Sequence, residues 1–168
     1  MTDMCVLTPP ETYERLAQGV EDGIIEAFSA MFDDVVACGE DNLNGAACDG
    51  VVGLISFVGY VSWSLAIVFP RETVLAMAER FTGCEIPFES ADMIDLTGEL
   101  MNIVAGPTSA QLIAHGFDAK MGLPSVARGP NVEVVLPDHM AYRLHFNSKQ
   151  GPFRVKIVAA QRSAQQTN

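Results

Sequence analysis

A run of 21 residues without a charged side chain, from Gly50 to Pro70, restricts the fold of this chain more than any other feature. A stretch of that length could span a bilayer as a helix. In its second half, however, apolar residues alternate with small or polar ones with a period of two, which is typical of a β-strand. We therefore expect two buried strands joined near Gly59 and Tyr60, as a hairpin over 50–69, and no membrane span.

An amphipathic helix is predicted before this hairpin. Thr8 can cap its first turn, prolines suit that turn, and Glu11 lies three residues after the capping threonine. Apolar positions then recur at helical spacing to about residue 36, with Gly19 and Gly23 as points where the helix could break or bend. Residues 38–49 are expected to form a loop.

Two more helices are predicted after the hairpin. The first begins near Arg71 and ends at Gly83, and the second begins near Ser90 and runs towards His115 and Gly116. Pro107 lies inside the second helix and removes one backbone hydrogen bond, so we expect a kink there.

The last third of the chain is predicted to form strands. In chain order we expect strands at 117–126, 132–136, 140–147 and 153–159, with a turn at 148–151 and a polar tail at 161–168. The order of elements indicates an α+β fold in which helices pack on a mostly antiparallel sheet. Each half opens with a helix and continues into strands, so we expect two pseudo-repeated halves within one domain, residues 1–168, with its core at about 20–160.

The charge and the cysteines restrict the function. The net charge is −11, and residues 1–50 contain eleven acidic residues against Arg15 alone. An acidic chain repels phosphate backbones, so we expect no nucleic-acid partner. The four cysteines form no Cys-x2-Cys pair, which argues against both a metal site and a disulfide framework. No basic stretch followed by an apolar run marks a signal peptide, and we expect a cytoplasmic protein.

A narrow polar stripe on the last predicted helix is the candidate site. With 100° per residue and Asp95 placed at zero, Glu99 falls at about 40° and Asn102 at about 340°. Gly106 lies within the stripe and Gly98 lies beside it. A glycine inside a helix costs roughly 1 kcal/mol relative to alanine, so either another element or a docking partner should approach closely here. On spacing alone, an ordinary solvated helix face would be the favoured interpretation of the stripe.

The residues of this stripe resemble the signature of the CheC/CheX/FliY phosphatases. The matching pattern is Asp95-x3-Glu99-x2-Asn102, with 21 residues between Asn102 and Pro124. The surrounding sequences, Gly98 to Gly106 and Gly122 to Val126, are also similar to the family. The resemblance extends over about residues 20–160 and is closest to CheX-like proteins.

This resemblance implies a function and roles for the residues. The family hydrolyses the aspartyl phosphate of a CheY-like receiver domain, in which Mg²⁺ is held by the receiver, so we expect the chain to need no cofactor of its own. By resemblance, Asn102 would orient the attacking water, and Glu99 would engage a lysine of the receiver. Asp95, Gly98 and Pro124 would support the site. The alternative is a binding module of the same fold that docks receivers without hydrolysing the phosphate.

A second, imperfect copy of the pattern lies on the first predicted helix. Asp22-x3-Glu26-x2 leads to Ser29, where family members with two sites carry asparagine. We expect this copy to be inactive, because serine lacks the amide. One working stripe is the CheX-like arrangement, and the resemblance therefore also implies a homodimer.

Overall fold

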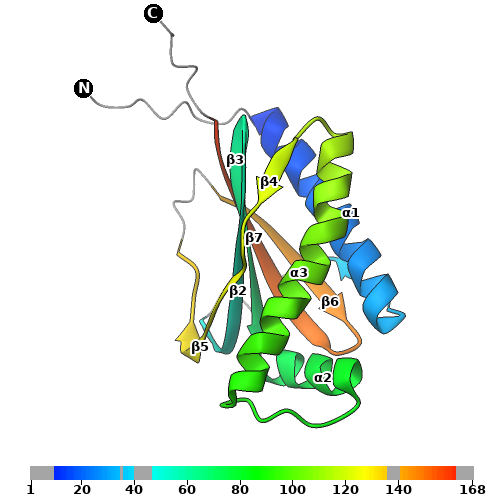
Figure 1. Ribbon diagram of the computed structural model, residues 1–168, viewed down its shortest axis with the longest axis vertical. Helices are drawn as coiled ribbons and strands as arrows, with labels where there is room; N and C mark the ends of the chain where they lie inside the picture. Colours follow the sequence, from blue (N-terminus) through cyan, green and yellow to red (C-terminus); the bar gives the residue numbers. More distant parts are fainter. Residues whose placement is uncertain (1–9, 35, 40–46, 136–140, 162–168) are drawn as a thin grey trace, which may run out of the picture.

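Three helices lie on one face of an antiparallel sheet in the computed structural model of this chain (Figure 1). The structure describes residues 10–34, 36–39, 47–135 and 141–161. The helices are α1 (Pro10–Phe32), α2 (Arg71–Thr82) and α3 (Ala91–Ala114). The strands are β1 (Ala37–Cys38), β2 (Cys48–Gly59), β3 (Val61–Pro70), β4 (Ala119–Met121), β5 (Ser125–Val132), β6 (Ala141–Ser148) and β7 (Gly151–Gln161). The predicted α+β class, with helices on an antiparallel sheet, is confirmed.

The strand order in the described part of the sheet is β1-β6-β7-β3-β2-β4, and β5 also pairs with β2. Every pairing is antiparallel. Strand β2 is long enough to pair with two successive segments of the chain on its outer side. Its residues Phe57–Gly59 pair with β4, and Cys48–Leu54 pair with β5. This arrangement brings the chain that follows α3 back along the same edge of the sheet.

The uncharged run forms the predicted hairpin. Strands β2 and β3 pair from Gly50 opposite Pro70 to Phe57 opposite Trp63, and the chain turns at Tyr60. Alternate residues of β3 face the helices, and the rings of Phe57 and Trp63 stack with centroids 3.7 Å apart. None of the helices that the structure describes is both long and apolar enough to cross a membrane.

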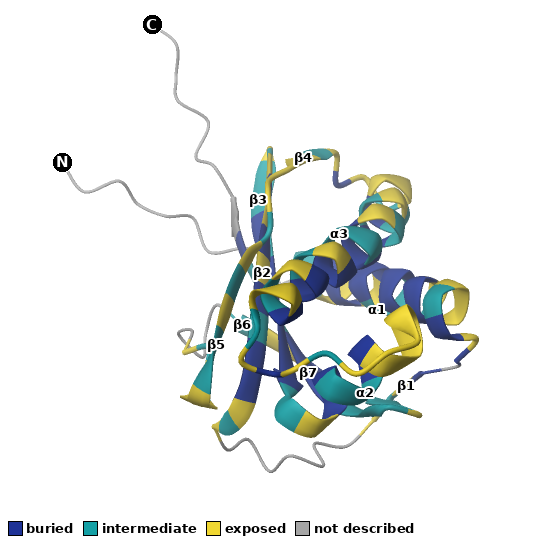
Figure 2. Cartoon of the chain, turned by 60° about the horizontal axis from the view of Figure 1, so that its bottom comes forward, coloured by how far each residue is buried: buried dark blue, intermediate teal, exposed yellow. Residues whose placement is uncertain are grey.

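Helices α1 and α3 pack side by side, and their buried faces are turned towards the sheet (Figure 2). The two glycines of α1 make this approach possible and do not break the helix. An added Cβ at Gly23 would lie 2.3 Å from Thr108 Cα, and one at Gly19 would lie 2.6 Å from Leu112 Cδ2. The prediction that the helix could break at these glycines is therefore wrong, because α1 is continuous from Pro10 to Phe32.

The ends of α1 also differ from the prediction. The helix ends at Phe32 and not near residue 36, since Asp33 adopts a left-handed conformation with φ of 49°. The predicted Thr8 cap lies outside the described residues. In the predicted loop, β1 already includes Cys38 and β2 begins at Cys48, while residues 40–46 lie outside the description.

Two of the predicted strands have the wrong bounds. The segment 117–126 is not one strand, because β4 ends at Met121 and β5 begins at Ser125. The amide of Gly122 still donates to Ser56 O at 2.7 Å, and Pro124, which has no amide hydrogen, follows where the ladder is interrupted. The predicted strand at 132–136 is also wrong, because β5 ends at Val132, the residue at which that strand was expected to begin. The turn at 148–151 and the two strands around it are confirmed within a few residues, and 162–168 lie outside the description.

Candidate functional site

Local sequence determines where α3 begins and which side it buries. Ser90 is the N-cap, and its hydroxyl accepts a hydrogen bond from Met93 N–H at 3.3 Å. The hydroxyls of Thr97 and Thr108 are buried and donate to carbonyl oxygens one turn earlier in the same helix. The apolar residues buried beside them are Met93, Leu96, Leu100, Met101, Val104 and Leu112. The helix continues through Pro107 to Ala114, so the polar stripe lies along one unbroken helix.

The predicted stripe faces outwards. The side chains of Asp95 and Glu99 are exposed, and Asn102, one turn further along, is half-buried. Within the described part of the chain, no hydrogen bond or ion pair occupies these three side chains. Their polar groups are therefore available to a molecule that approaches from outside.

A shallow groove runs beside the stripe and includes all five residues that the sequence predicted for the site. It has a volume of about 500 Å³ and is open to solvent. Its lining consists of Ile94, Asp95, Gly98, Glu99, Asn102, Pro124 and Val126. One wall is α3, and the other is the chain at the start of β5. The structure thus brings Pro124 next to the stripe although 21 residues separate it from Asn102.

Two lining residues were not predicted. Ile94 lies one helical turn before Gly98, so the helical period that revealed the stripe could have revealed it as well. Val126 has no such signal, because its position depends on how β5 pairs with β2.

The glycines of the stripe border open space. A Cβ added at Gly98 or Gly106 would have no heavy atom within 4 Å, apart from its chain neighbours and the backbone of the adjacent turns of α3. Of the two reasons considered for these glycines, close approach by another element of the described chain is therefore wrong. Close approach by a docking partner stays a prediction.

The second copy of the pattern lies on α1 and differs in its surroundings. Asp22 Oδ1 accepts a hydrogen bond from Gln18 at 3.0 Å, and Glu26 Oε2 accepts one from Gln111 at 3.1 Å. Ser29 is exposed. Both carboxylates thus have partners within the chain, in contrast to those of α3.

In the part of the chain that the structure describes, no group of three or more His, Cys, Asp or Glu side chains is placed to hold a metal ion. Cys38, Cys48 and Cys84 are free thiols. The pKa of Cys38 is raised, mainly by burial and further by the negative charge of Glu21.

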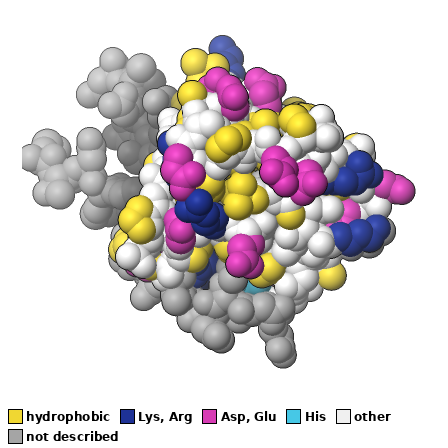
Figure 3. All heavy atoms as spheres, turned by 90° about the horizontal axis from the view of Figure 1, so that it is seen from below, with side chains coloured by type: hydrophobic (Ala, Val, Ile, Leu, Met, Phe, Trp, Pro, Cys, Tyr) yellow, Lys and Arg dark blue, Asp and Glu magenta, His cyan; other side chains and the backbone are white. Residues whose placement is uncertain are grey.

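A second groove, of about 580 Å³, lies between α2 and the segment that precedes α3. It is lined by Leu75, Ala76, Glu79, Glu85, Ile86 and Pro87. Figure 3 shows the lower face of the molecule, where acidic side chains are spread among exposed apolar ones. This groove has carboxylates but no amide, and none of the predicted site residues lines it, so the α3 groove is the better candidate for chemistry.

Comparisons with known proteins identify a family and several similar structures. A family model described as chemotaxis phosphatase CheX matches residues 51–147, which include the stripe and Pro124. A comparison with curated protein sequences finds no match.

Several solved structures are similar. CheX from Vibrio vulnificus is 21% identical, with 86% of this chain and 95% of that chain covered and a TM-score of 0.75. A CheC-like superfamily protein from Shewanella sp. PV-4 is 25% identical, with 86% and 97% covered and a TM-score of 0.70. A CheX–CheY–BeF3–Mg²⁺ complex from Borrelia burgdorferi contains a chain 19% identical, with 86% and 97% covered and a TM-score of 0.69.

The family match extends over more than half of the chain. The solved structures share the fold of this chain over most of their own length. This chain belongs to the CheX family of chemotaxis phosphatases.

Proposed function

We propose that this protein hydrolyses the aspartyl phosphate of a CheY-like receiver domain at the α3 groove. The observation that carries the proposal is the pair formed by exposed Glu99 and half-buried Asn102, one turn apart on one helix and without partners in the described chain. The family is one of chemotaxis phosphatases, and a similar CheX chain has been solved in a complex with CheY.

The reaction needs a water in line with the phosphorus. The water oxygen forms a bond to phosphorus while the bond from phosphorus to the aspartyl oxygen breaks, which releases inorganic phosphate and restores the carboxylate. Phosphoryl transfer of this kind depends mainly on positioning and on stabilisation of charge. The carboxamide of Asn102 can accept from and donate to one water without changing its protonation state. We therefore assign to Asn102 the orientation of the attacking water.

The remaining residues would hold the receiver in place. We propose that Glu99 forms an ion pair with a lysine of the receiver, and that Asp95 supports docking from the preceding turn. Pro124 forms the opposite wall of the groove, and Gly98 leaves room for the approaching partner. Mg²⁺ would be held by the receiver, as the composition of the Borrelia complex suggests.

The direct test is phosphate release from a phosphorylated receiver with and without this protein. Wild-type protein should accelerate release, and Asn102→Ala should lose at least about a hundredfold of that acceleration, because positioning effects in enzymes reach this size. Glu99→Ala should greatly reduce it. Equal acceleration by wild type and Asn102→Ala would refute the role assigned to this amide.

Two control variants separate the site from the general surface. Asp92→Ala removes an exposed acid of the same helix that does not line the groove, and Ser29→Ala changes the second copy of the pattern. Both should retain the wild-type rate. Binding of an activated receiver without faster hydrolysis would instead establish the alternative, a non-catalytic receiver-binding module.

We also propose that the chain acts as one domain, as a homodimer, in the cytoplasm together with its receiver. One apolar core joins residues from Leu16 on α1 to Ala159 on β7, which supports a single domain. Leu54 and Val58 are 40% and 53% exposed on the face of β2 that points away from the helices, and they offer apolar area for a second copy. Light scattering after gel filtration would show a mass of one chain if the dimer proposal is wrong.

A further inference from the structure

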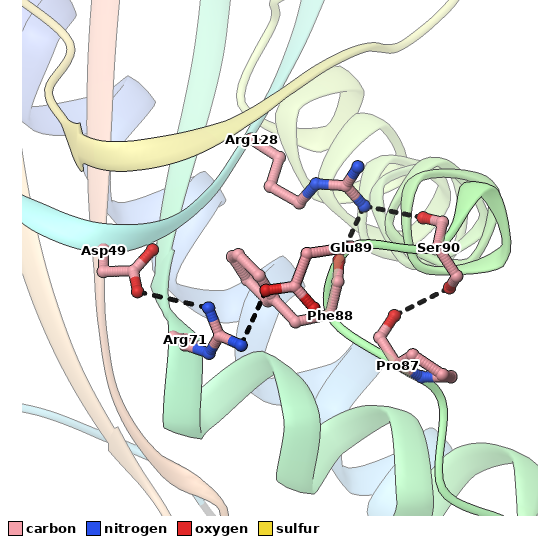
Figure 4. A network of polar contacts seen from close by, with 7 residues as sticks. All are labelled: Asp49, Arg71, Pro87, Phe88, Glu89, Ser90 and Arg128. Atoms are coloured by element: carbon pink, nitrogen blue, oxygen red, sulfur yellow. Dashed lines mark hydrogen bonds and ion pairs between the residues drawn. The ribbon is translucent and has the colours of Figure 1, made fainter.

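One guanidinium group holds the first turn of α3 to the sheet (Figure 4). Nη1 of Arg128, on β5, donates to the carbonyl oxygens of Phe88 and Ser90, both at 2.6 Å. Ser90 caps α3, and its hydroxyl also donates to Pro87 O at 2.7 Å. Arg128 therefore contacts the residue at which α3 begins and, through Phe88, the segment that leads into it.

The electrostatics of this contact are unusual. The N-terminus of a helix carries a partial positive charge, so a cation beside it is unfavourable. Here Arg128 is compensated by the two carbonyl oxygens and by the ring of Phe88, whose centroid lies 5.8 Å from the guanidinium carbon. The pKa of nearby Glu89 is lowered, mainly by its hydrogen bond with Arg71 and to a smaller extent by the charge of Arg128. Arg128 therefore acts on α3 by fixing the position of its first turn, and not by a favourable interaction with the helix dipole.

The contact lies next to both walls of the α3 groove. Ser90 is one helical turn before Ile94, which begins the groove on α3. Val126 and Arg128 lie two residues apart on β5, opposite Gly53 and Val51 of β2, so their side chains share one face of the sheet. Arg128 thus joins the wall formed by α3 to the wall formed by β5.

We propose that Arg128 is a positioning residue that sets the distance and rotation of α3 relative to β5, and so the width of the groove that receives the phosphorylated receiver. This inference rests on the proposed function of the groove. Glu99 and Asn102 lie on the same helix and keep their mutual spacing if α3 shifts. Loss of Arg128 therefore weakens docking more than it slows hydrolysis in the docked complex.

Arg71 provides a matched control. Its guanidinium carbon lies 4.2 Å from the centroid of the same Phe88 ring, and it forms ion pairs with Asp49 at 3.4 Å and Glu89 at 2.8 Å. Within the residues that the structure describes, it forms no hydrogen bond or ion pair with a residue of α3 or with its cap. Arg71→Met removes an arginine from the same ring and leaves the contact of Arg128 with Ser90 intact.

The first measurement separates docking from turnover. Affinity for a beryllofluoride-activated receiver and the maximal rate of phosphate release are measured for each variant. Arg128→Met should weaken affinity by about tenfold or more, as expected for loss of charge-assisted hydrogen bonds, and change the maximal rate by less than about threefold. Arg128→Lys keeps a cationic donor and should recover part of the affinity. Arg71→Met should match wild type in both, and Asn102→Ala should lose the rate but keep the affinity.

The second measurement needs no receiver. Hydrogen exchange of residues 91–97, followed by mass spectrometry, should be faster in Arg128→Met than in wild type and unchanged in Arg71→Met. Should Arg128→Met fail to fold, Arg128→Gln must show the same two changes. Unchanged exchange and unchanged affinity would overturn the inference. Faster exchange in a protein whose wild type does not accelerate hydrolysis would refute the proposed function and leave the positioning of α3 by Arg128 standing.

Discussion

Replacing Gly98 by alanine should stabilise the protein while it weakens the proposed activity. Gly98 lies inside α3, where alanine is favoured over glycine by about 1 kcal/mol. Apart from its chain neighbours and the backbone of the adjacent turns of α3, the added methyl group would meet no heavy atom within 4 Å, so no clash offsets this gain. We expect the free energy of unfolding to rise by about 0.5–1 kcal/mol, which for a chain of this size raises the melting temperature by about 1–4 °C.

The same substitution at Gly23 should have the opposite sign. Gly23 also lies inside a helix, but its Cβ would lie 2.3 Å from Thr108 Cα and 2.6 Å from Thr108 N, which are backbone atoms of α3. Overpacking of this kind typically costs about 1–3 kcal/mol and exceeds the gain in helix propensity. After the gain in helix propensity is subtracted, we expect Gly23→Ala to lower the free energy of unfolding by up to about 2 kcal/mol.

Both variants are measured by urea denaturation followed by circular dichroism at 222 nm, and by phosphate release from the phosphorylated receiver. Gly98→Ala should release phosphate more slowly although it is more stable, because the methyl group occupies the surface to which the receiver docks. Destabilisation by Gly98→Ala would refute the reasoning about open space. Full activity in a stabilised Gly98→Ala would show that the receiver does not approach this glycine closely.

Two further predictions concern groups outside the groove. Asp34 is buried and accepts a hydrogen bond from the backbone amide of Lys149 at 2.7 Å, so Asp34→Ala should lower the free energy of unfolding by about 1.5–3 kcal/mol. The ammonium group of Lys149 lies 3.9 Å from the Asp34 carboxylate and the lysine side chain is 70% exposed, so Lys149→Ala should cost no more than about 0.5 kcal/mol. Equal losses of stability in the two variants, measured by urea denaturation, would show that the ion pair and not the hydrogen bond to the backbone holds Asp34. Burial raises the pKa of the Cys38 thiol, so iodoacetamide should alkylate exposed Cys84 before Cys38, and alkylation of Cys38 should become faster as the pH rises. Peptide mapping that finds Cys38 modified first at pH 8 would show that burial does not protect it.

The bounds of the strands after α3 show where sequence reasoning fails. Apolar residues from 117 to 126 alternate well enough to suggest a single strand, yet β4 and β5 are separate. The two segments pair with β2 in registers that differ by one residue, Phe57 opposite Met121 and Leu54 opposite Ser125, and Pro124, which has no amide hydrogen, lies between them. A strand's bounds depend on its partner, and the partner lies 60 or more residues away in the chain. The ends of α2 and α3 were predicted more closely, because a helix forms its hydrogen bonds within a few residues.

The candidate site divides in the same way. Asp95, Glu99 and Asn102 share one face of a helix because of the helical period alone, so the stripe could be predicted without a structure. The apolar residues on the other side of α3 also determine that the stripe faces solvent. Recognition of the family added roles for these residues, which stay proposals until they are measured.

Sequence alone therefore determined the helices, the hairpin of β2 and β3, and the orientation of the stripe, since each depends on a local period of 3.6 or 2 residues. Tertiary structure alone decided that Pro124 and Val126 form the opposite wall, and that Arg128 holds both walls together. It also decided that Gly23 is pressed against α3 while Gly98 borders open space. These facts depend on contacts between residues far apart in the chain, and such contacts exist only when the sheet has paired and the helices have packed on it.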